Sequence, residues 1–69
     1  MNEKYFTERL FWLPDTNKLL HVSFMYGHGW LSQMETVVGW QLHLRQDTYA
    51  ELMRFYASLN PELLLQEEL

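Results

Sequence analysis

The sequence predicts an α+β domain: a three-stranded antiparallel β-meander with one amphipathic helix packed on one face and a short C-terminal helix. Three observations support this fold class. Within residues 36–60 the period of the apolar residues changes from two to about 3.6. Two earlier segments also favour strands, and residues typical of turns separate the segments. The expected order of elements is therefore β-β-β-α-α in a single domain, residues 1–69.

The first element, residues 3–13, fits two structures. Its aromatic residues favour a strand, whereas Phe6, Leu10 and Leu13 also fall on one stripe of a helix. The sequence leaves both open, and we expect the strand because Pro14–Asn17 is typical of a hairpin turn. A tight turn there gives a defined register, which pairs Leu13 with Lys18, Phe11 with Leu20 and Arg9 with Val22.

The second strand is expected over residues 18–26, where one alternating set of side chains is apolar. Gly27 and Gly29 allow the positive φ angles of a tight reversal. Residues 30–35 fit either a loop or the beginning of a long third strand with a bulge at Gly39. The third strand is clearest over residues 38–45, where four apolar residues alternate with other residues: Val38, Trp40, Leu42 and Leu44.

The main helix is expected to begin after Thr48. Thr48 and Glu51 have the spacing of a capping box, in which each side chain binds a free amide of the first turn. The apolar stripe of this helix comprises Tyr49, Leu52, Met53, Tyr56 and Leu59. After it, Asn60-Pro61 indicates the beginning of a second, short helix with Leu63 to Leu65 on its apolar side.

Composition narrows the class of protein. The 69 residues include no cysteine, which excludes disulfides, thiolate metal sites and cysteine nucleophiles and favours a reducing compartment. The chain begins with Met, shows no signal peptide, and has no run near the roughly 18 apolar residues of a membrane span. We therefore expect a complete, soluble cytoplasmic protein with no membrane association.

The net charge of −4 comes from the C-terminal third. Five acidic residues there, with Arg54 as the only cation, form an expected acidic surface: Asp47, Glu51, Glu62, Glu67 and Glu68. Binding to nucleic-acid phosphates needs clustered Lys and Arg, so this charge argues against it. It permits a basic partner or mimicry of nucleic acid, although a solvated acidic tail is the simpler interpretation.

Placing the strands in register leaves apolar side chains on both faces of the sheet, and one helix covers only one face. A large apolar patch on a small protein is typical of an interaction surface, used for a foreign protein or for a second copy. The alternative is that the C-terminal helix folds over the patch. The expected partner-binding residues are Phe6, Leu10, Trp12, Leu19, Met25 and Trp30.

The sequence gives little support for metal binding or catalysis. His21 lies opposite His43 if the second and third strands pair so that the residue numbers sum to 64. Two histidines without a third ligand make an incomplete zinc site, and no metal or other cofactor is expected. No nucleophile motif or phosphate loop is present, so we expect that the protein is not an enzyme.

The sequence therefore favours a small non-catalytic protein-binding module, an inhibitor or adaptor of a larger protein or complex that acts by surface occlusion. We expect it to form a homodimer. Small acidic proteins of phages and other mobile elements, such as anti-restriction and anti-CRISPR proteins, are of this type. The alternative function is a small nucleic-acid-binding regulator of transcription or DNA processing that uses the sheet face.

Overall fold

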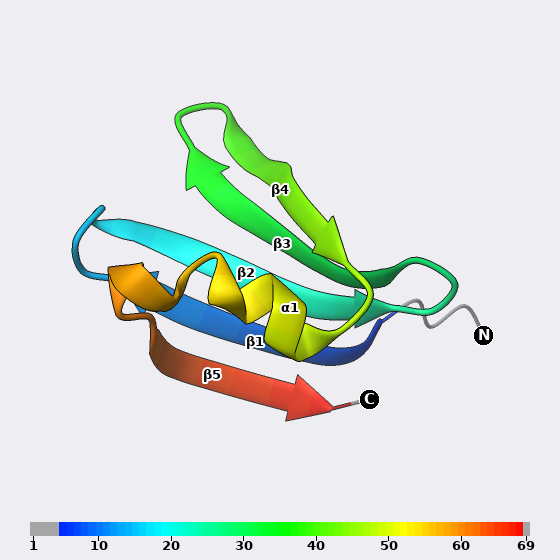
Figure 1. Ribbon diagram of the computed structural model, residues 1–69. Coiled ribbons are helices and arrows are strands. Elements are labelled where there is room, and N and C mark those ends of the chain that lie inside the picture. Colours follow the sequence, from blue (N-terminus) through cyan, green and yellow to red (C-terminus); the bar gives the residue numbers. More distant parts are fainter. Residues whose placement is uncertain (1–4, 69) are drawn as a thin grey trace.

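The computed structural model describes residues 5–68 of the chain, with side chains described for residues 7–67. Their fold is one five-stranded antiparallel sheet in the order β4-β3-β2-β1-β5, with a short helix across one face (Figure 1). The elements are β1 (Tyr5–Leu13), β2 (Lys18–Met25), β3 (Gly29–Thr36), β4 (Gly39–Gln46), α1 (Tyr49–Arg54), the 3-10 turn η1 (Ala57–Leu59) and β5 (Glu62–Glu68). The predicted antiparallel sheet and its single covering helix are present, but the prediction of three strands and two helices was wrong.

The first hairpin was predicted correctly. β1 and β2 pair in the expected register, with Leu13 opposite Lys18 and Phe11 opposite Leu20. Asn17 has a positive φ of 58°, and its amide donates to the carbonyl oxygen of Leu13 at 2.8 Å. Residues 5–13 are therefore strand, because the local turn brings them beside β2 and both backbones satisfy their hydrogen bonds there.

Residues 29–46 form two strands where the sequence predicts one strand with an uncertain beginning. The turn between β3 and β4 contains two exposed valines, Val37 and Val38, which are unusual turn residues. Thr36 compensates: its hydroxyl donates to the carbonyl oxygen of Gly39 at 2.7 Å and accepts from the amide of Val38 at 3.2 Å. Gly39, at a φ of 114°, completes the reversal instead of forming the predicted bulge.

The C-terminal segment is a strand, which contradicts the predicted second helix. Asn60 adopts a left-handed conformation with a φ of 53° and ends η1. The chain then runs antiparallel to β1, with Leu65 opposite Leu10 (Figure 1). A short helix here would have to form without a surface to pack on, whereas pairing with β1 satisfies the backbone groups of an otherwise open sheet edge.

The helix begins as predicted, since the Thr48 hydroxyl accepts from the amide of Glu51 at 3.1 Å. Its predicted stripe faces the sheet: Leu52 and Tyr56 are buried, and the other three members pack against the same cluster. The core lies between this stripe and one face of the sheet. Its buried apolar residues are Phe11, Leu13, Leu20, Val22, Leu52 and Tyr56.

The turn between β2 and β3 offers a matched test of backbone strain. Gly27 and Gly29 both have a φ near +85°, at 85° and 87°. A Cβ at Gly29 would lie 2.9 Å from the carbonyl oxygen of Gln46, whereas a Cβ at Gly27 would have no neighbour within 4 Å. We expect Gly27→Ala to lower the free energy of unfolding by about 1 kcal/mol and Gly29→Ala by about 1–2 kcal/mol more. Urea denaturation of both variants measures the difference, and equal losses would contradict the close approach of β4 to this turn.

Candidate interaction face

The sheet face opposite α1, called the uncovered face below, carries three rows of side chains that the strand registers define. We assign residues to it by alternation from the buried core residues of β1 and β2, and then by strand pairing for β3, β4 and β5. The first row holds Glu62, Trp12, Leu19, Glu35 and Trp40; the second holds Leu10, His21, Gln33, Leu42 and Leu65; the third holds Glu8, Ser23, Leu31, Arg45 and Glu67.

Apolar side chains on this face remain open to solvent. Trp40, Leu42 and Leu65 are 45%, 64% and 54% exposed. The neighbouring Leu10 and Trp12 are partly buried by the sheet itself. Because α1 lies on the other face and the C-terminal segment is an added strand, neither covers these side chains (Figure 1). The alternative, in which a C-terminal helix folds over the patch, is therefore not found among residues 5–68.

The structure brings together part of the predicted contact set. Leu10, Trp12 and Leu19 lie side by side on the uncovered face, and alternation places Met25 on the same face at the end of β2. The side chain of Phe6 lies outside the described side chains. Trp30 lies on the covered face, so it is not part of the predicted patch.

Trp30 belongs to a cluster beside α1. Its ring centroid is 5.0 Å from that of Tyr49 and 5.5 Å from that of Phe24. The Arg9 guanidinium lies over the Tyr49 ring at 4.4 Å and over the Trp30 ring at 5.6 Å. This cluster extends the core toward one end of the sheet and holds the only cation that β1 contributes between residues 5 and 13.

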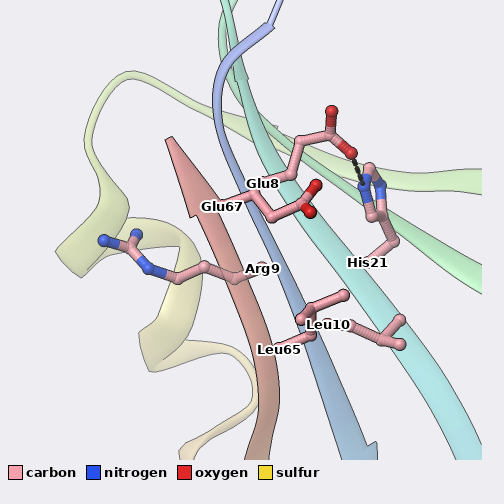
Figure 2. Close-up of a pocket in the computed structure, with 6 residues that line it drawn as sticks. All are labelled: Glu8, Arg9, Leu10, His21, Leu65 and Glu67. Carbon is pink, nitrogen blue, oxygen red and sulfur yellow. Dashed lines mark hydrogen bonds and ion pairs between the residues drawn. The ribbon is translucent and has the colours of Figure 1, made fainter. Parts of the chain in front are cut away.

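A small group of polar side chains lies on the uncovered face, where β5, β1 and β2 adjoin. The Nε2 atom of His21 is 3.2 Å from Oε1 of Glu8, and this contact is an ion pair when the imidazole is protonated. Glu67 lies opposite Glu8 on β5. Figure 2 shows their carboxylates on the same side, with Leu10 and Leu65 beside them and the Arg9 side chain extending away. These residues line a cavity of about 110 Å³.

The predicted pairing of His21 with His43 does not occur, because β3 lies between β2 and β4. His21 lies opposite Gln33, and its ring meets the edge of Trp40 at a centroid distance of 6.1 Å. A register shift between β3 and β4 gives β4 one extra residue beside Ser32. His43 occupies that position and contacts Tyr56 on the covered face.

The Tyr56 hydroxyl is the centre of a partly buried hydrogen-bond network. It lies 2.5 Å from Ser32 Oγ and 2.6 Å from His43 Nδ1, and Ser32 Oγ accepts from the amide of Leu44 at 3.1 Å. Burial raises the pKa of Tyr56, and the hydrogen bond from Ser32 opposes that shift only in part. Tyr56 therefore stays protonated near neutral pH, and the network joins η1 to the bulge of β4.

The described side chains include no group of three His, Cys, Asp or Glu residues that could hold a metal ion. The five residues of the expected acidic surface lie on different elements of the structure. Asp47 precedes α1, and Glu51 lies on α1, where its carboxylate accepts from the Thr48 hydroxyl. The remaining three acidic residues, Glu62, Glu67 and Glu68, lie on β5, because that segment is a strand.

A second, more open cavity of about 340 Å³ lies at the end of α1, lined by Gln46, Glu51, Arg54 and Phe55. Phe55 is 59% exposed, as its position off the helical stripe predicts. An acidic and a basic residue line this cavity together, so it favours no ligand charge. We therefore regard the uncovered face as the stronger candidate.

Sequence reasoning missed Trp40, Leu42 and Leu65 as members of the uncovered face. It assigned the first two to the strand surface beneath the helix and the third to a helix. The signal that could have placed Trp40 and Leu42 is the length of the segment 29–46, which is long enough for two strands of eight residues.

No helix among residues 5–68 is long and apolar enough to cross a membrane. No family model matches the chain, and no curated protein or solved structure shows significant similarity to it. The residues and geometry of the uncovered face are therefore the basis for assigning a function.

Proposed function

We propose that this chain is a small non-catalytic protein-binding module that acts as an inhibitor or adaptor by occupying a surface of a larger protein or complex. The observation that carries the proposal is the uncovered face, where Trp40, Leu42 and Leu65 are 45–64% exposed on a sheet whose other face already holds the core. A solvated sheet face normally alternates to polar residues. An apolar face of this kind is typical of an interaction surface.

Energetics favour covering this face. Complete burial of a large apolar side chain contributes about 1.5–3 kcal/mol. Roughly half of each side chain of Trp40, Leu42 and Leu65 is still exposed, so burying the rest would contribute roughly half of that free energy for each. A partner that covers all three, together with the partly buried Leu10 and Trp12, would gain several kcal/mol before its entropic costs. The acidic composition and small size are typical of inhibitors that mobile elements encode.

The alternative, a nucleic-acid-binding regulator, has less support on this face. Glu8, Glu35 and Glu67 share the uncovered face with Arg45, so its carboxylates outnumber its arginines and lysines among the described side chains. Phosphate backbones require the opposite balance. A steep loss of affinity for DNA or RNA with added salt would nevertheless favour the regulator over the protein-binding module.

Affinity capture from the native host tests the proposal. Leu42→Asp places a charge in the second row of the uncovered face, on the edge strand β4. Phe55→Asp is the matched control because Phe55 is similarly exposed, at 59% against 64%. We expect Leu42→Asp to weaken capture of the partner protein by about 100-fold and Phe55→Asp to leave it unchanged. Equal capture by wild type and a folded Leu42→Asp variant would contradict the proposal.

Light scattering of the purified protein separates the two kinds of partner. A dimer that Leu42→Asp converts to a monomer would assign the face to a second copy, as the homodimer hypothesis requires. A monomer at high concentration leaves the face free for a foreign protein.

A further inference from the structure

We infer that the partner of the uncovered face is a foreign protein surface with an apolar centre and one lysine or arginine side chain, whose cation enters between Glu8 and Glu67. This inference rests on the proposed function and adds the chemistry of the partner. It follows from the charge of the face, the walls of the cavity at its β5 side and the position of the apolar side chains beside it.

The first step is the charge. Glu8 and Glu67 lie directly opposite each other on adjacent antiparallel strands, where two like charges disfavour the pairing. Arg9, the next residue along β1, cannot compensate because its guanidinium lies over the Tyr49 ring on the covered face. His21 contacts one oxygen of Glu8. The two carboxylates therefore complement a cation supplied from outside.

The second step is the shape. The cavity of about 110 Å³ beside these carboxylates is also lined by Leu10 and Leu65, and Figure 2 shows both leucines on the side away from the carboxylate oxygens. A water molecule takes about 30 Å³ of liquid volume, so the cavity accepts a group of a few heavy atoms such as a guanidinium or an ammonium. The methylene stem of a lysine or arginine would lie on the leucines while its charged head reaches the carboxylates.

The third step is the surrounding surface. On the other side of His21, the second row of the face continues to Leu42, and Trp40 contacts the His21 ring. A partner that covers Leu42 and also Leu10 and Leu65, at the β5 side of the same row, excludes water near Glu8 and Glu67. The loss of water strengthens their attraction for a cation and penalises a partner without one. The net charge of −4 would also steer a basic surface toward the chain.

Nuclear magnetic resonance with a small probe tests the cation site on the intact chain. The probe is acetyl-arginine amide, and acetyl-citrulline amide is the uncharged control of the same shape. We expect saturable amide shifts with the arginine probe around Glu8, His21 and Glu67, and about tenfold weaker binding of the citrulline probe. The double variant Glu8→Gln and Glu67→Gln should lose the response, while its remaining spectrum reports an intact fold. Equal binding of the two probes, or an unchanged response in the double variant, would overturn the inference.

The captured partner then separates this inference from the proposed function. We expect the Gln double variant to bind that partner about tenfold more weakly, and Leu42→Asp to weaken it further. If Leu42→Asp abolishes capture while the double variant binds as tightly as wild type, the inference fails and the proposed function stands. If neither variant changes capture, the proposed function fails as well. A homodimer across the face, or a nucleic acid in place of a protein, would also overturn the inference.

Discussion

Leu52→Ala is expected to lower the free energy of unfolding by about 3 kcal/mol, the middle of the range for a leucine removed from a packed core. Leu52 is 0% exposed and is the central contact between α1 and the sheet, where it packs in one cluster with Phe11, Leu20 and Val22. A single-domain core of this size rarely supplies more than about 3–5 kcal/mol of net stability. The variant should therefore be largely unfolded in mild urea, which circular dichroism and tryptophan fluorescence would both report.

Phe55→Ala is the control, because Phe55 lies three residues after Leu52, at the C-cap of α1, and is 59% exposed. We expect it to change the free energy of unfolding by less than about 0.5 kcal/mol, although it removes a larger side chain. Similar losses in the two variants would show that α1 is not held to the sheet through Leu52.

The parts of the fold that the sequence predicts correctly depend on contacts close in the chain. The register of the first hairpin follows from one turn, in which Pro14 presets φ and Asn17 adopts the positive φ that such turns require. The beginning of α1 follows from Thr48 and Glu51, whose capping contacts span three residues. Each of these signals is complete within a short window of sequence.

The parts that were wrong depend on distant pairing or on unusual turn residues. The turn at Val37 and Val38 lacks the glycine or asparagine pair that usually indicates a hairpin. The boundary between β3 and β4 could therefore not be recognised from the sequence pattern. The assignment of β5 depends on β1, which lies far away in sequence: Arg9 and Gln66, 57 residues apart, are hydrogen-bonded across the two strands. Three consecutive leucines after Asn60-Pro61 fit a helix and a strand equally, and only the open edge of β1 favours the strand.

For the candidate site too, the residues placed correctly were those that depend on contacts close in the chain. Leu10, Trp12 and Leu19 were placed correctly on the uncovered face because they belong to the first hairpin, whose register was correct. The position of Glu67 opposite Glu8 required β5, and that of Leu42 required the hairpin of β3 and β4. The general idea of a sheet with two apolar faces thus survived errors in the number of strands, because it depended on alternation within β1 and β2.

Trp30 and Trp40 provide the sharpest test of which face holds the core. Both are tryptophans at the beginning of a strand, Trp30 in β3 and Trp40 in β4, but Trp30 packs on Tyr49 and Phe24. We expect Trp30→Ala to lower the free energy of unfolding by about 3 kcal/mol, since it leaves a void beside α1 and removes a ring from the Arg9 guanidinium.

Trp40→Ala should show the opposite pattern. Trp40 is 45% exposed on the uncovered face, so its loss should cost less than about 1 kcal/mol of stability while weakening partner capture by about tenfold or more, as a buried tryptophan at an interface does. Urea denaturation and quantitative capture, measured on both variants at a temperature where Trp30→Ala remains folded, give the comparison. If Trp30→Ala lost the partner and kept its stability, and Trp40→Ala did the reverse, the assignment of the two faces to core and partner would have to be exchanged.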